Sequence, residues 1–238
     1  MSKYNTDLDY VILGIDISRE ELEEIESEAD KIISENKESN ENLAVAYLKK
    51  AQCLRKLNID WGSSFILYDD MGLPFEKDDE CKRLLEKALE LSPDMPEALM
   101  QLGLISYSLL IVGCNIDETI NLFSKAIQLK PNYAAAFNNR AIIFFGSMDY
   151  YESRPIESLK DNDNFEKAKI DSKNAIVDLT EAIKIRPYDA LYHLYRGTLH
   201  SKLGEHKEAA EDFSSAIKYA SEALKIDYWN KVFLMRTN

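Results

Sequence analysis

Three histidines are the residues of this chain best suited to bind a metal ion or to move a proton near neutral pH: His193, His200 and His206. His193 and His200 are seven residues apart, so a helix would place them on one face, where they could approach a metal ion together. A protein metal site usually needs a supporting carboxylate or a third ligand at a fitting spacing. We therefore interpret both histidines as packing residues and predict no metal site. The alternative is a metal-dependent regulator or enzyme that uses them with a carboxylate such as Asp149.

Sequence motifs that mark a catalytic centre are absent: there is no P-loop, no GxSxG, no HExxH and no GxGxxG between a strand and a helix. The three cysteines, Cys53, Cys81 and Cys114, form no CxxC pair and are odd in number. A disulfide framework or a zinc knuckle is therefore not expected, and we interpret the cysteines as small apolar residues on helices. We predict no catalytic residues and no cofactor.

The composition is that of an ordinary globular protein, with 238 residues, 45% hydrophobic and 30% charged. Lys and Arg number 29 and Asp and Glu number 42, which gives a net charge of −13. Such an acidic chain is poorly suited to bind nucleic acid or an anionic lipid surface. The first residues show no signal-peptide pattern, and no apolar run is long enough to span a membrane. We expect a cytoplasmic protein without membrane contact.

A short phrase occurs three times along the chain, as KALELSP at 87–93, KAIQLKP at 125–131 and EAIKIRP at 181–187. In each copy an apolar residue precedes the alanine by three positions, and a small residue precedes that by four. These spacings place the side chains on one stripe of a helix, which the closing proline ends. A fourth copy surrounds Ala216, with Ser221 in place of the proline.

A second helical pattern precedes each phrase. In it a large residue is followed four positions later by Gly or Ala, which would leave a knob beside a hollow. The four pairs are Tyr47 and Ala51, Leu99 and Gly103, Phe137 and Ala141, and His193 and Gly197.

Ala182 and Ala216 are 34 residues apart, and the segment 195–218 between two such patterns keeps the Gly, Ala, Phe and Ala of a known repeat. In this respect the chain resembles the tetratricopeptide repeat, a 34-residue unit of two helices. The resemblance covers about residues 43–221. It implies an all-α fold, a right-handed superhelix of antiparallel helix pairs. The family usually has Trp and Tyr where His193 and His200 stand.

The copies are separated by unequal distances, and the extra residues fall inside repeats. We place the repeats at about 43–93, 96–131, 134–187 and 190–221, with insertions at 58–77 and 146–164. The step from each phrase alanine to the next hollow is constant, 15 residues in each case: Ala88 to Gly103, Ala126 to Ala141 and Ala182 to Gly197. The insertions could be loops, helix extensions or binding elements.

Segments on both sides of the repeats have their own predictions. Residues 1–42 form an N-terminal arm and a flanking helix over 18–36, which begins with a capping box of Ser18 and Glu21. Within the arm, 10–15 is either a short strand or an extended segment packed on the first repeat. Residues 222–238 are predicted to be a C-terminal capping helix. The same helix could instead support a weak homodimer, so the chain is either a monomer or such a dimer.

The first helix of each repeat is expected to line a concave groove that holds a peptide or an amphipathic helix. Some of these positions could instead face neighbouring helices or the N-terminal arm. The predicted groove residues are Lys49, Gln52, Arg55, Met100, Gln101, Leu104, Tyr107, Asn138, Asn139, Ile142, Phe145, Leu194, Tyr195 and Thr198.

The function that follows from these patterns is non-catalytic binding: a scaffold or adaptor that holds a segment of a partner protein. One alternative is a small chaperone that shields an apolar segment of a client protein. The other is the enzyme or metal-dependent regulator based on His193 and His200.

Overall fold

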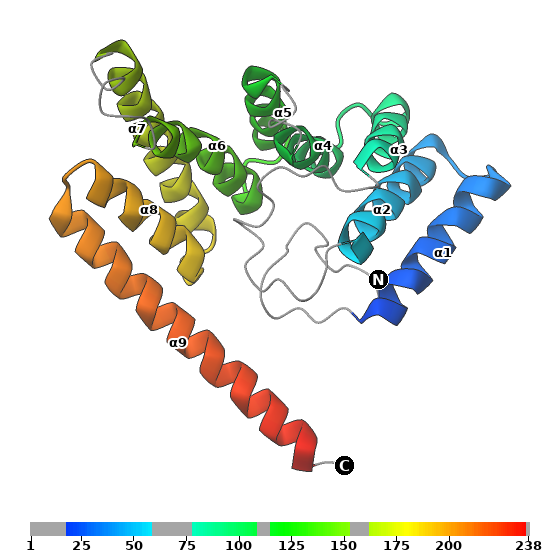
Figure 1. Cartoon of the computed structure of the whole chain (residues 1–238). Coiled ribbons are helices and arrows are strands. Elements are labelled where there is room, and N and C mark those ends of the chain that lie inside the picture. The colour runs from blue at the N-terminus through cyan, green and yellow to red at the C-terminus, as the bar shows by residue number, and fades with distance from the viewer. Residues whose placement is uncertain (1–17, 59–77, 109–114, 153–161, 237–238) are drawn as a thin grey trace. The chain divides into compact units, whose positions relative to one another are not determined.

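The computed structural model describes residues 18–58, 78–108, 115–152 and 162–236, and this part of the chain is built of helices without a strand. The predicted all-α class is therefore confirmed. The helices run in the order shown in Figure 1. Their bounds are α1 (Arg19–Glu35), α2 (Asn40–Asn58), α3 (Asp78–Leu91), α4 (Pro96–Ser108), α5 (Ile116–Leu129), α6 (Ala134–Glu152), α7 (Asn162–Ile185), α8 (Ala190–Lys202) and α9 (His206–Arg236).

Helix ends are set by side chains that the sequence places there. Ser18 caps α1 by accepting a hydrogen bond from the backbone N–H of Glu21, and the Glu21 carboxylate accepts one from the backbone N–H of Ser18. This is the predicted capping box. Asn115 and Asp189 cap α5 and α8 in the same way through their side-chain oxygens.

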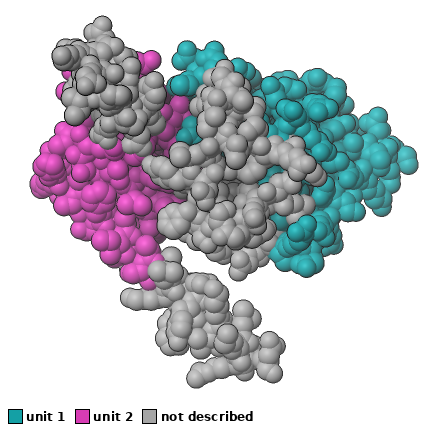
Figure 2. All heavy atoms as spheres, viewed as in Figure 1, with its two compact units in different colours: residues 1–131 teal, residues 132–238 magenta. Residues whose placement is uncertain are grey.

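The chain divides into two compact units, residues 1–131 and 132–238, coloured separately in Figure 2. Unit 1 contains α1 to α5 and unit 2 contains α6 to α9, and within each unit consecutive helices pack against one another. We call α2, α4, α6 and α8 the front helices, and α3, α5, α7 and α9 the back helices. Each front helix and the back helix after it correspond to one predicted repeat.

The repeated alanines form the buried contact between helices. Ala88, Ala126 and Ala182 are fully buried, as is the residue seven positions before each of them. In unit 1 the core also contains Leu48, Leu54 and Leu85, which come from α2 and α3. The spacing of three and four residues thus places the same stripe of every back helix in the interior.

Two glycines allow a front helix to lie close against its back helix. A Cβ atom added to Gly103 on α4 would be 2.7 Å from the Phe123 ring on α5. One added to Gly197 on α8 would be 3.0 Å from the Phe213 ring on α9. Each phenylalanine therefore occupies the hollow that the sequence predicted beside the glycine.

The predicted insertions and ends are only partly within the described residues. The segments 1–17, 59–77 and 153–161 lie outside them, including the possible strand at 10–15. On both sides of 153–161 the backbone is helical, since α6 continues to Glu152 and α7 begins at Asn162. Part of the 146–164 insertion therefore lengthens the two helices of the third repeat.

The last helix is longer than one repeat requires. α9 has 31 residues and continues without a break through the segment predicted as a separate cap. In Figure 1 its C-terminal half extends beyond the end of α8. That this half covers the end of the repeats stays a prediction.

Candidate protein-binding surfaces on the front helices

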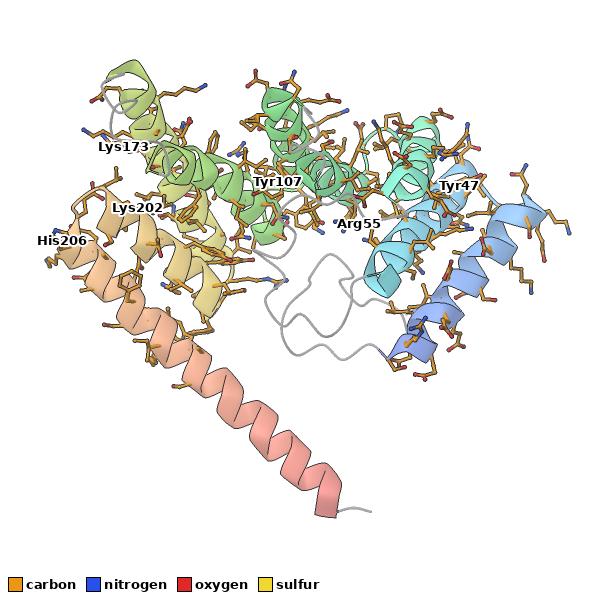
Figure 3. All side chains as sticks on the ribbon, in the orientation of Figure 1. Tyr47, Arg55, Tyr107, Lys173, Lys202 and His206 are labelled. Carbon is orange, nitrogen blue, oxygen red and sulfur yellow. The ribbon has the colours of Figure 1, made fainter. Side chains whose placement is uncertain are left out.

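In unit 1 the predicted groove residues lie on α2 and α4, two front helices that contact each other. The Arg55 guanidinium on α2 donates a hydrogen bond to the side-chain oxygen of Gln101 on α4, over 3.1 Å between Nη1 and Oε1. Lys49, Leu104 and Tyr107 are partly exposed. Figure 3 shows Arg55 and Tyr107 on these neighbouring helices. Arg55 and Gln101 are thus two of the predicted residues that this contact brings together.

Four of the predicted groove residues are buried. Met100 is fully buried, and this position is a correction: its side chain packs in the interior of unit 1 and is not available to a partner. Gln52, Gln101 and Asn138 are also buried, with at most 8% of each residue exposed. Their burial is consistent with the alternative, in which some of the predicted residues face neighbouring helices or the N-terminal arm.

In unit 2 the predicted residues lie on α6 and α8, and aromatic side chains join the two helices. The rings of Phe145 on α6 and Tyr195 on α8 have centroids 6.4 Å apart and are tilted by 59°. The Lys202 ammonium on α8 lies 5.9 Å from the centre of the Phe145 ring. Leu194 is 42% exposed beside this pair. This surface combines aromatic and aliphatic side chains with one cation.

Four further predicted residues of unit 2 differ in their exposure. Asn138 and Asn139 are adjacent, and the Asn138 Nδ2 donates to the Asn139 Oδ1 over 3.4 Å. The Oδ1 atom of Asn138 is buried without a hydrogen-bond partner. Ile142 and Thr198 are partly exposed. A single groove through all four repeats stays a prediction, and each unit has its own surface.

Sequence analysis missed a pair of buried ionic contacts that join front to back helices in unit 2. The Arg140 guanidinium on α6 donates two hydrogen bonds to the Asp178 carboxylate on α7, over 2.8 and 2.7 Å. Arg196 on α8 binds Asp212 on α9 over the same two distances. Both arginines directly precede the hollow residue, and both aspartates precede the phrase alanine by four positions. That shared position in the repeat was the available signal.

Leucines occupy most of the equivalent positions in unit 1. Leu102 and Leu122 stand where the second repeat would have its arginine and aspartate, and Leu84 stands at the aspartate position of the first. Lys50 takes the arginine position there, and its ammonium binds Asp30 on α1 over 2.6 Å instead. The pKa of Lys50 is raised mainly by this hydrogen bond. Leu84 and Leu102 pack against the apolar core of unit 1, whereas the arginines and aspartates at these positions of unit 2 form ion pairs.

The two aspartates have pKa values shifted in opposite directions. Burial raises the pKa of Asp178 more than the hydrogen bonds from Arg140 lower it. Burial also acts to raise the pKa of Asp212, but hydrogen bonds and charge from Arg196 and then His193 outweigh it, so this pKa is lowered.

The side chains of His193 and His200 contact carboxylates in this part of unit 2. The ring of His193 is 7% exposed and lies with Nε2 2.9 Å from the Pro187 carbonyl oxygen and Nδ1 3.4 Å from the Asp212 carboxylate. His200 Nδ1 lies 2.6 Å from the Glu205 carboxylate. Among the described residues no three His, Cys, Asp or Glu side chains are grouped to hold a metal ion. The interpretation of His193 as a buried packing residue is confirmed, with a polar role added.

The comparisons with known proteins identify the fold. No family model matches the chain. The chain is 26% identical over 201 residues to human "Tetratricopeptide repeat protein 13", a match that covers 78% of this chain and 20% of that protein. Among solved structures, "Crystal structure of MamA" is 18% identical and covers 90% of this chain and 99% of its own, with a TM-score of 0.52. "MamA RS-1 ArsTM double mutant" is 16% identical and covers 86% and 88%, with a TM-score of 0.55.

The chain thus spans about a fifth of the length of the human relative it matches. In the described residues no helix combines the length and the apolar character needed to cross a lipid bilayer.

Proposed function

We propose that this chain is a tetratricopeptide-like repeat protein that acts as a non-catalytic interaction module and holds a segment of a partner protein on its front helices. Stacked helix pairs of this kind build extended surfaces from equivalent positions of successive repeats. Such a surface needs no reactive side chains. Its specificity comes from pockets and polar groups that match an extended peptide or one face of a helix.

The observation that supports this proposal most is the surface on α6 and α8. Phe145, Tyr195 and Leu194 remain partly exposed there although they are large and apolar or aromatic. Aromatic side chains at the centre of a surface commonly contribute most of the binding energy between proteins. Lys202 and Asn139, which are partly exposed on the same helices, would orient a peptide that carries both apolar side chains and free backbone groups.

The test places a photo-crosslinking amino acid at Leu194 of the full chain and identifies the proteins attached to it inside cells. Leu194→Asp and Tyr195→Asp, introduced separately with the crosslinker at Thr198, should abolish the attachment, since an unpaired carboxylate cannot be buried cheaply against an apolar partner. Ile217→Asp is the matched control, because Ile217 is 71% exposed on the back helix α9 of the same unit. Equal attachment in all three variants would show that the front helices are not the binding surface.

A chaperone role is the second candidate, and the apolar character of the same surface favours it. A chaperone would prevent aggregation of a purified client with an exposed apolar segment, whereas an adaptor would bind its partner in the folded state. Light scattering of such a client with and without the chain separates the two, with Leu194→Asp as the inactive control.

The metal-dependent alternative receives less support from the side chains. Both ring nitrogens of His193 already face acceptors within the protein, and the Asp149 side chain lies outside those described. We propose no catalytic or metal-binding role for this chain.

A further inference from the structure

A second surface lies between α1 and α2 in unit 1; it shares Lys49 with the predicted front-helix groove but contains neither Phe145 nor Tyr195. The two helices leave a groove of ≈ 230 Å³ between them. Its apolar floor is formed by Ile25, Ala29, Ile32, Val45 and Ala46. Ile25, Ala29 and Ala46 are buried, whereas Val45 is 37% exposed and Ile32 is partly exposed. We call this surface the α1–α2 groove.

The residues that line the groove follow one spacing on both helices. On α1 they run from Ile25 to Ile32 and on α2 from Asn42 to Lys49, each time at positions i, i+3, i+4 and i+7. This is the spacing of a single helix face, and it spans about 10 Å along each axis at 1.5 Å per residue. Two such faces side by side could bind two turns of a third helix, whose apolar residues would recur at the same spacing.

Charge is distributed unevenly along the groove. Glu28 and Glu38 line it and are exposed, and Lys49 is the one cation among the described lining residues. At the end near the turn between the two helices, Glu35, Glu38 and Glu41 are all exposed. Lys37 lies 3.9 Å from the Glu35 carboxylate, an exposed pair that offsets little of this charge.

From the groove and its charge we propose that the α1–α2 groove binds a basic amphipathic helix of a partner protein. The apolar face of that helix packs on the floor between α1 and α2. Its Lys and Arg residues lie toward Glu35, Glu38 and Glu41, and Lys49 at the other end faces an acidic or polar residue of the partner. Charge complementarity of this kind raises the association rate and fixes the orientation of the bound helix. The proposal does not depend on the surface formed by Phe145 and Tyr195, neither of which lines the α1–α2 groove.

The experiment uses three fluorescent synthetic peptides and the full chain. One has leucines at i, i+3, i+4 and i+7 with lysines at one end and a glutamine at the other, the second replaces the lysines by glutamates, and the third scrambles the first. Fluorescence anisotropy at about 0.15 M salt measures their affinities. The lysine peptide should bind at least tenfold more tightly than either of the others, and amide hydrogen exchange should show protection in α1 and α2.

Two substitutions in the chain and two matched controls locate the binding. Val45→Asp and Glu28→Lys should each lower the affinity for the lysine peptide at least tenfold, since both change exposed positions in the groove. Val177→Asp alters a valine on α7 that is 60% exposed, and Glu23→Lys makes the same charge change on α1 outside the groove lining. Both controls should bind as the parent chain does.

Three results would overturn the proposal. The first is equal binding of the lysine and glutamate peptides, and the second is equal loss in the variants and their controls. The third is that analytical sedimentation finds the chain alone to be a dimer and finds that Val45→Asp dissociates it. A second copy of the chain would then occupy the groove. Loss of front-helix crosslinking on Leu194→Asp is measured separately, so failure of one proposal leaves the other distinguishable.

Discussion

Arg196 binds both carboxylate oxygens of Asp212 across the α8–α9 contact, with donor–acceptor distances of 2.8 and 2.7 Å. The Arg196 Nη1 also donates to the Thr180 hydroxyl on α7 over 3.1 Å. One guanidinium therefore connects the last helix pair to the back helix of the preceding repeat. In unit 2 a single polar side chain holds three helices together.

The first prediction concerns this arginine. Arg196→Met should destabilise the protein by about 3–5 kcal/mol, because it leaves the buried Asp212 carboxylate without its main partner. Adding Asp212→Leu should recover most of that loss. The free energy of unfolding by urea measures both variants, and Lys184→Met is the control, because the exposed Lys184–Glu181 pair should contribute less than about 1 kcal/mol. A loss no larger than that of the control would contradict the structural role of Arg196.

The second prediction is that the two buried aspartates titrate on opposite sides of the usual value of 3.8. The lowered pKa of Asp212 means that its contribution to stability is complete above about pH 3.8 and is lost as the pH falls through its folded value. The raised pKa of Asp178 has the reverse sign, so its effect makes the protein less stable as the pH rises from 3.8 through its folded value. Carbon-13 NMR titration of the two carboxyl groups measures both directly. A common pKa for both groups would refute the distinction.

The third prediction concerns the close approach of α4 and α5. Gly103→Ala should cost about 1–3 kcal/mol, because the new methyl group would meet the Phe123 ring at 2.7 Å. Combining it with Phe123→Leu should cost less than the sum of the two single changes, since the smaller side chain leaves room. A double-mutant cycle by thermal or chemical unfolding measures this coupling. Simple additivity would show that the two side chains do not share the hollow.

The fourth prediction uses the buried oxygen of Asn138, which lacks a hydrogen-bond partner. Asn138→Leu should stabilise the protein by about 1 kcal/mol, because an apolar group of similar size removes the cost of an unsatisfied acceptor. Thermal unfolding measures the gain. If Asn138 also orients a partner on the front helices, the same variant should lose crosslinking at Leu194. A destabilised variant would indicate that the amide is needed in the folded chain itself.

Much of the helical core could be predicted from spacing alone. Ala88, Ala126 and Ala182 were expected on a buried stripe and are fully buried, because a helix with 3.6 residues per turn fixes which positions share a face. The capping box at Ser18 was likewise readable, since it depends on two residues three positions apart. Local rules were sufficient at these positions.

The surface was harder to predict because burial there depends on how closely neighbouring front helices approach. Met100 follows the same pattern as partly exposed groove residues, yet it is fully buried. Arg140 and Asp178 are 38 positions apart in the chain, and the spacing of apolar residues does not predict a contact between them. Comparing polar residues at equivalent repeat positions would have found it, since Arg196 and Asp212 share the same places.

The exchange of leucines for ion pairs between the units has a thermal consequence. Burial of apolar surface stabilises a protein less as it is cooled, whereas the cost of dehydrating charged groups falls as it is heated. The helices of unit 1, which pack through an apolar core, should therefore loosen first in the cold, while those joined through Arg140 and Arg196 keep their strength toward higher temperature. Unit 1 and unit 2 of one chain would then differ in how their stability depends on temperature.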